Sequence, residues 1–141
     1  MPLTFPIFNL ALWLKLRSML CAQIALIEHD RILLVRTGLG NGWELPGGVV
    51  APPEAPEATI MRELGRQAGY ELLDSPELVG VFSDPSRATL RVYFTVFISR
   101  TFRPAASRLI SSNAELRWFA RDALPGDASP ICGKVVGALV D

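Results

Sequence analysis

Residues 43–70, WELPGGVVAPPEAPEATIMRELGRQAGY, determine which fold this sequence predicts. The stretch indicates a short strand, a turn rich in glycine and proline, and then a helix. Proline is tolerated in the first turn of a helix, so Pro56 marks its beginning, and the neighbouring Glu57 suits the positive end of the helix dipole. Gly69 marks its end, because glycine readily adopts the left-handed conformation that terminates helices.

The two faces of this helix differ in polarity. Met61, Leu64 and Ala68 are spaced as on one apolar stripe, and we therefore expect them in the core. The opposite face collects polar side chains beside the glycine-rich turn, where a phosphate or metal site would require them. These side chains are Thr59, Glu63, Arg66 and Gln67.

The spacing of this stretch resembles the Nudix box of the Nudix hydrolase superfamily, which includes the MutT-like proteins. In the box, glycine precedes a glutamate, an Arg-Glu pair follows, and a Glu-Glu pair comes shortly before a closing glycine. The box of this chain covers residues 48–70. Its matching positions are Gly48, Glu54, Arg62, Glu63 and Gly69, and the preceding residues 43–47 are similar to the usual lead-in.

The box departs from the family pattern at Ala51 and Pro53, where an acidic residue and a glycine are frequent, and at two adjacent positions of the helix. Arg66 and Gln67 stand where the family has its Glu-Glu pair, so the helix scaffold is present and its charge complement is not. Mg²⁺ prefers charged oxygen ligands in octahedral geometry. Glu63 still offers a carboxylate, whereas Gln67 offers a neutral amide oxygen and Arg66 a cation. The resemblance therefore implies Mg²⁺ or Mn²⁺ as the cofactor, bound at a weakened or atypical site.

The resemblance also implies an activity, the hydrolysis of small molecules in which a diphosphate is linked to another moiety, often a nucleoside. In such enzymes metal ions neutralise phosphate charge and activate a water molecule. A carboxylate accepts the proton of that water, and cationic side chains stabilise the charge on the leaving phosphate.

Each family role is carried over to a position of this sequence. The metal ligands implied in this way are Glu63, Gln67 and the backbone carbonyl of Gly47. The catalytic candidates are Glu63 and Glu115, and the candidates for phosphate binding are Arg66, Arg36, Arg87 and Arg91. The resemblance implies structural roles for Gly48, Glu54, Arg62 and Gly69, with Glu54 and Arg62 paired so that they fix the loop against the helix.

Outside the box the sequence indicates several strands and one further helix. Strands are expected at 21–28, 32–36, 78–82, 89–99 and 114–120, a loop at 100–113, and a helix near 131–140. The resemblance covers residues 21–141 as one Nudix domain. It implies an α/β protein, an α/β/α sandwich in which helices flank a mixed β-sheet.

Residues 1–20 form an apolar N-terminal segment that we expect to be helical. Its apolar run is too short to span a bilayer, so no transmembrane segment is expected. We expect the segment to pack on the domain or on a second copy of it, which would make a homodimer. The alternative is an interfacial membrane anchor.

The composition restricts the partners and the compartment. A formal net charge of zero gives no general attraction to nucleic acid, so we expect a small-molecule diphosphate ligand and no nucleic acid polymer. The two cysteines, Cys21 and Cys132, are far apart and lack the spacing of a zinc site. They are typical of buried thiols in a reducing compartment, and a cytoplasmic location is expected.

Three functional interpretations remain open at this point. The first is a Nudix-type hydrolase with an unusual metal site. The second is a catalytically silent Nudix domain that binds a nucleotide-like ligand or a protein, with Arg66 binding a diphosphate directly. The third is a folded scaffold whose apolar N-terminus makes an oligomer or membrane contact.

Overall fold

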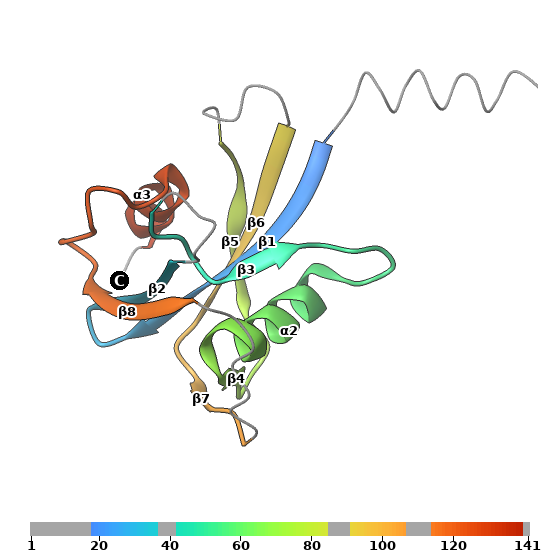
Figure 1. Ribbon diagram of the computed structural model, residues 1–141, viewed down its shortest axis with the longest axis horizontal. Helices are drawn as coiled ribbons and strands as arrows, with labels where there is room; N and C mark the ends of the chain where they lie inside the picture. Colours follow the sequence, from blue (N-terminus) through green and yellow to red (C-terminus); the bar gives the residue numbers. More distant parts are fainter. Residues whose placement is uncertain (1–17, 37–41, 85–90, 107–113, 140–141) are drawn as a thin grey trace, which may run out of the picture.

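The computed structural model describes residues 18–36, 42–84, 91–106 and 114–139, which fold into a mixed β-sheet flanked by helices (Figure 1). The expected α/β fold, a sandwich of helices around a mixed sheet, is confirmed. The predictions for residues 1–17 and for Arg87 lie outside the described ranges. No helix within those ranges has the length and hydrophobicity that a membrane span requires.

The described elements form one main sheet, one small sheet and helices on both faces. The strands are β1 (Ser18–Glu28), β2 (Arg31–Arg36), β3 (Gly47–Val49), β4 (Tyr70–Leu72), β5 (Glu77–Ser83), β6 (Arg91–Ser99), β7 (Phe102–Pro104) and β8 (Glu115–Ala120), and the helices are α2 (Pro56–Ala68) and α3 (Pro130–Ala138). The main sheet has the order β5-β6-β1-β2-β8, with β3 also paired to β1.

β1 lies at the centre of this sheet. It runs parallel to β6, from Ser18 opposite Arg91 to Leu26 opposite Ser99, and antiparallel to β2 and β3. The strand begins at Ser18, so residues 18–20, which we expected in the N-terminal segment, belong to β1. Pairing with β6 extends the strand there, and this long-range contact has no local signal in the sequence.

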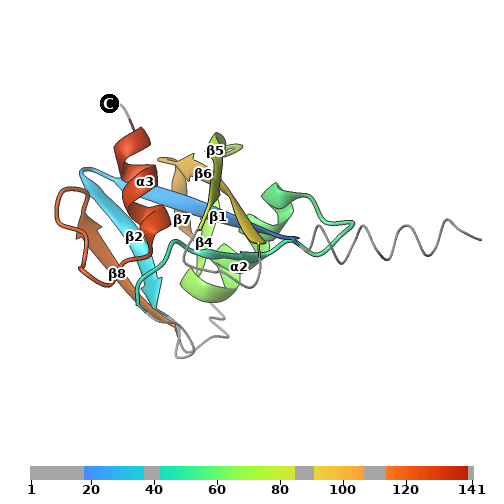
Figure 2. The same cartoon turned by 90° about the horizontal axis from the view of Figure 1, so that it is seen from above.

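Each face of the sheet carries its own hydrophobic core, because alternate residues of a strand point to opposite faces. On one face, Ala25 of β1 and Val135 of α3 belong to the same buried cluster. On the other face, Ile24 of β1 packs in a cluster with Leu64 of α2. The two helices therefore cover opposite faces of the sheet (Figure 2).

The buried stripe of α2 differs by one position from the expected one. Ile60, Leu64 and Ala68 are buried, at the i, i+4, i+8 spacing of one helix face. Met61 is 58% exposed, so its predicted place in the core is wrong. It lies one residue beyond Ile60, and the resulting rotation of about 100° turns its side chain toward solvent.

The small sheet of β4 and β7 was not predicted from the sequence. Tyr70 pairs with Pro104 and Leu72 with Phe102, in a region where residues 100–113 were expected to form a loop. Strands of this length carry too few residues to display an alternating pattern. Tertiary contact forms them, and the Tyr70 and Phe102 rings meet edge to face at 5.5 Å.

Candidate functional site

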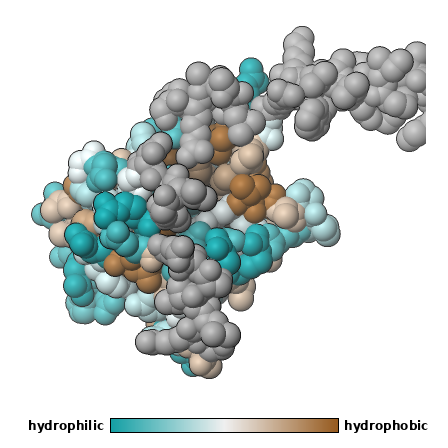
Figure 3. Space-filling model, viewed as in Figure 1, coloured by the Kyte–Doolittle hydropathy of each residue, from teal (hydrophilic) through white to brown (hydrophobic). Residues whose placement is uncertain are grey.

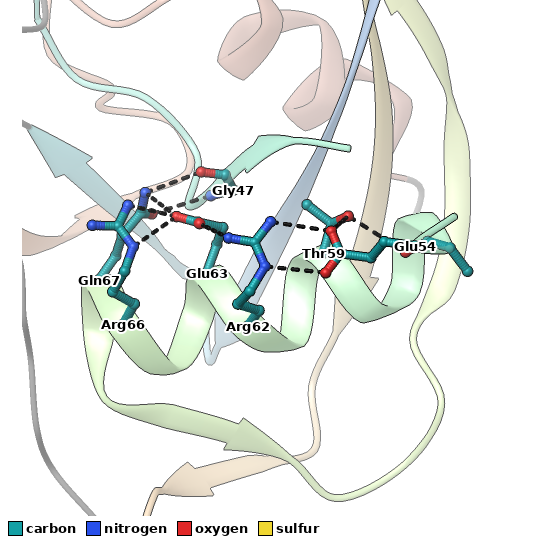
Figure 4. Close-up of polar contacts among 8 residues, drawn as sticks. Gly47, Glu54, Thr59, Arg62, Glu63, Arg66 and Gln67 are labelled. Carbon is teal, nitrogen blue, oxygen red and sulfur yellow. Dashed lines mark hydrogen bonds and ion pairs between the residues drawn. The ribbon is translucent and has the colours of Figure 1, made fainter. Parts of the chain in front are cut away.

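A continuous polar cluster connects α2 to the glycine-rich strand β3 and to the loop that follows it (Figure 4). We call it the box cluster, and its members are Gly47, Glu54, Thr59, Arg62, Glu63, Arg66 and Gln67. Thr59, Glu63 and Gln67 recur at every fourth position of α2 and are all buried. The helix thus presents a buried polar ridge beside its apolar stripe.

Glu63 is the centre of the box cluster. Its side chain is only 8% exposed, yet cations contact both carboxylate oxygens. Arg62 Nη1 donates to Oε1, and Arg66 donates to Oε2 through Nη2 at 2.6 Å and Nε at 3.2 Å. Gln67 Nε2 adds a third donor to Oε2 at 3.1 Å. The carboxylate is therefore enclosed by N–H donors of the same helix.

Gln67 joins the helix to the backbone of Gly47. Its Nε2 donates to the Gly47 carbonyl at 3.0 Å, and its Oε1 accepts from the Gly47 N–H at 3.2 Å. The amide oxygen that could have served as a ligand is thus bonded to a backbone N–H. The Gly47 carbonyl, the other neutral candidate ligand, is bonded to Nε2.

Glu54 anchors the loop to the other end of the helix face. Arg62 donates to it through Nε and Nη2, both at 3.1 Å, and Thr59 Oγ1 donates at 2.6 Å. These hydrogen bonds lower the pKa of Glu54 from an ordinary 4.5 to about 2, and the hydrogen bond from Arg62 has the largest effect. The pairing of Glu54 with Arg62 that the resemblance implied is present.

The low pKa of Glu54 predicts a pH dependence. The folded state favours the ionised carboxylate, so the stabilisation is fully present above about pH 4.5 and is lost as the pH falls toward 2. A carbon-detected NMR titration should give Glu54 a pKa of about 2 in the wild type, and a value raised toward 4.5 in Arg62→Gln. Arg103→Gln removes the partner of Glu71 instead and should leave the Glu54 titration unchanged. Equal Glu54 values in the wild type and Arg62→Gln would contradict this assignment.

The donor set of the box cluster does not fit the divalent-metal site of the family. Mg²⁺ and Mn²⁺ require several anionic oxygens around one point. Within the described ranges no group of three or more His, Cys, Asp or Glu side chains could hold a metal ion. Of the two carboxylates in the cluster, Glu54 is bonded to Arg62, and Glu63 is bonded to Arg62 and Arg66. A guanidinium, Arg66, and a neutral amide, Gln67, therefore lie where the family has carboxylate ligands.

The remaining candidate residues lie outside the box cluster. Arg36 and Glu115, proposed for phosphate binding and catalysis, bond to each other across β2 and β8 at 3.0 and 3.1 Å. The Arg36 guanidinium also lies 4.7 Å from the centre of the Trp43 ring. Arg91 is exposed at the start of β6. The structure thus unites the box candidates and leaves Arg36, Glu115 and Arg91 apart from their bonding network.

The sequence placed Thr59 on the polar face of the helix but gave it no specific role in the site. Its hydroxyl supports Glu54, and its side chain is fully buried. The available signal was its position four residues before Glu63 and eight before Gln67, on the same helix face.

Comparisons with known proteins point to one family. The family model described as NUDIX domain matches residues 19–136. A MutT-like protein of Streptomyces ambofaciens is 33% identical over 107 residues, which are 76% of this chain and 66% of that protein. A putative 8-oxo-dGTP diphosphatase of Bacillus subtilis (strain 168) is 39% identical over 62 residues, which are 44% of this chain and 41% of that protein. In both cases the match spans less than two thirds of the relative.

Solved structures share the fold. The crystal structure of a MutT NUDIX hydrolase from Burkholderia pseudomallei superposes with a TM-score of 0.74 at 22% identity, and the match covers 88% of this chain and 99% of that one. A likeness of this extent supports the fold described above.

Proposed function

Because this chain belongs to the NUDIX domain family, we propose that it binds a nucleotide-like small molecule through its diphosphate, with Arg62 and Arg66 as the cationic partners and with metal-dependent hydrolysis strongly weakened. The observation that carries the proposal is that a guanidinium, Arg66, and a neutral amide, Gln67, contact Glu63 at the two positions where the family has carboxylates. The exposed guanidinium groups of Arg62 and Arg66 can attract phosphate oxygens, whereas the carboxylates of the family pattern attract metal ions.

The two arginines are suitably placed for an anion. Their side chains are 47% and 44% exposed, and they lie one turn apart on the solvent side of α2. The visible surface over this helix is hydrophilic (Figure 3). Among the described residues Arg66 uses Nε and Nη2 for Glu63 and has no partner for Nη1. A guanidinium with free N–H groups can bind phosphate oxygens in a bidentate manner.

Weak hydrolysis follows from the state of Glu63. A general base needs a lone pair directed at the attacking water. Both Glu63 oxygens already accept hydrogen bonds from side chains of the same helix, namely Arg62, Arg66 and Gln67. Proton abstraction by this carboxylate is therefore unfavourable in the arrangement observed.

A second candidate function is hydrolysis at a rate typical of the family. The observation that favours it is the retention of Glu63 and the Gly47 carbonyl beside each other, joined through Gln67 Nε2. The two curated relatives, one MutT-like and one a putative 8-oxo-dGTP diphosphatase, also support it.

Two assays separate these functions. We expect calorimetric binding of ADP, GDP and inorganic pyrophosphate to persist in EDTA and to weaken about tenfold in Arg66→Ala, since a charge-assisted bidentate contact is lost. Arg103→Ala, at an exposed arginine outside the box cluster, should bind as the wild type does. Phosphate release would be measured in parallel with nucleoside triphosphates, nucleoside diphosphate derivatives and dinucleoside polyphosphates.

Each combination of outcomes in the two assays supports one function or excludes both. Binding in EDTA without substantial turnover supports the first function. Rapid turnover that requires Mg²⁺ or Mn²⁺ and disappears in Glu63→Gln supports the second. Folded protein that neither binds nor hydrolyses any of these compounds would exclude both.

We also propose a cytoplasmic location. The proposal is supported by Cys21 and Cys132, which are both buried and form no disulfide. Burial raises the pKa of the Cys132 thiol, which makes it less reactive toward oxidants. Cell fractionation would locate the protein, and a thiol-labelling reagent applied to the denatured protein would test whether both cysteines are reduced. Labelling of both cysteines in the cytoplasmic fraction is expected.

A further inference from the structure

The box cluster also has a role in the resting protein that does not depend on any ligand. We infer that Gln67 replaces the divalent cation as the link between the glycine-rich strand and α2, and that Arg66 replaces its positive charge beside Glu63, so that the box is ordered and stable without metal. This inference is independent of the proposed function, because it concerns how the loop is held and not what the site binds.

The first argument is the position of the Gln67 amide nitrogen. It lies 3.0 Å from the Gly47 carbonyl oxygen and 3.1 Å from Glu63 Oε2. An amide nitrogen carries two hydrogens, which can donate separately to these two oxygens. One oxygen belongs to β3 and the other to α2, so a single side chain joins the two elements. A metal ion shared by the same oxygens would make the same connection.

The second argument is the charge balance. The cluster contains two carboxylates, Glu54 and Glu63, and two guanidinium groups, Arg62 and Arg66, all joined by hydrogen bonds. Each buried or half-buried charge therefore has an opposite partner. A further cation beside Glu63 would gain attraction from one carboxylate and be repelled by both guanidinium groups.

The third argument is the tight packing around Glu63. A Cβ added to Gly48 would lie 3.0 Å from Glu63 Cγ and 3.1 Å from its Cδ, so the strand backbone lies directly against the carboxylate. On the helix side, Arg66 and Gln67 cover Oε2. Since these two residues provide the cover, changing both to glutamate should produce the opposite behaviour. Carboxylates at 63, 66 and 67 would share one helix face and require a cation.

The test is the double variant R66E/Q67E, examined with Mn²⁺ alone and no nucleotide. In electron paramagnetic resonance titrations we expect the variant to bind Mn²⁺ at least about tenfold more tightly than the wild type, because two carboxylates are gained and one cation is removed. Its Tm should rise with Mn²⁺ and fall in EDTA, whereas the Tm of the wild type should not change. The control R31E/S75E makes the same change in net charge at exposed positions outside the box.

A second variant tests the link if the first does not fold. Gln67→Met keeps the length of the side chain and removes the amide, so hydrogen exchange at the Gly47 amide should accelerate at least about tenfold. The Val35 amide, which is bonded to the Glu44 carbonyl, is the internal control and should not change. Mn²⁺ binding by the wild type as tight as by folded R66E/Q67E would overturn the inference. So would wild-type Gly47 exchange that slows on addition of metal, or unchanged Gly47 exchange in Gln67→Met.

Discussion

Replacing Gly47 by alanine is expected to destabilise the domain by about 3 kcal/mol or more, the largest effect of any small substitution in the box. A Cβ at this position would lie 2.1 Å from the carbonyl oxygen of Ala22 and 2.8 Å from Cα of Gln23. Both are backbone atoms of the central strand β1. Gly47 also has φ of 156°, a conformation that residues with a side chain rarely adopt.

The clash cannot be relieved locally. Gly47 is paired with Gln23 in the sheet, and its N–H and carbonyl are both bonded to Gln67, so any shift breaks contacts on two sides. Urea unfolding followed by circular dichroism would measure the change in the free energy of unfolding.

Gly65 provides the matched control. It lies inside α2, and a Cβ there would meet no atom within 4 Å. Alanine is a better helix former than glycine, so Gly65→Ala should stabilise the domain by about 0.5–1 kcal/mol. A loss of stability in Gly47→Ala no larger than about 1 kcal/mol would show that the strand can move away from β1, contrary to the packing described.

Leu64→Ala is expected to lower the free energy of unfolding by about 3 kcal/mol. The Leu64 side chain is fully buried in the cluster that joins α2 to the sheet, together with Ile24 and Leu33 of neighbouring strands. Truncation removes apolar area from the core and leaves a cavity that the rigid sheet cannot fill. For a domain of this size the Tm should fall by about 8 °C.

Met61→Ala is the informative comparison for Leu64→Ala. The sequence pattern predicts that both residues face the core, and the structure places only Leu64 there. Met61→Ala should therefore change the free energy of unfolding by less than about 0.5 kcal/mol. Similar losses for the two variants would mean that α2 is rotated relative to the arrangement in the structure.

The sequence by itself determined the scaffold of the box. The fixed spacing of glycine, glutamate and the Arg-Glu pair predicted a strand, a loop and a helix. The helix α2 runs from Pro56 to Ala68, and Gly69 adopts the left-handed conformation that ends it. These features depend on local chemistry, namely a fixed φ at proline, a permissive glycine and apolar residues repeating along one helix face. The family and its fold follow from this local information.

The sequence also shows that the box lacks two negative charges that the family pattern has. Arg66 and Gln67 in place of two glutamates indicated an atypical metal site before any contact was known. The sequence did not reveal that Gln67 bonds to both the backbone of Gly47 and Glu63, because a glutamine can serve as ligand, donor or solvated surface residue.

Only the tertiary structure decided which partners the candidate residues have. Arg36 and Glu115 are 79 positions apart, and the pairing of β2 with β8 brings them together as an ion pair. Gly47 and Gln67 are 20 positions apart and meet because β1 holds β3 beside α2. Such contacts depend on how elements pack over two cores, and neither periodicity nor spacing encodes them. The sequence therefore determined the elements, and long-range packing determined whether each polar side chain faces solvent, an arginine or a backbone amide.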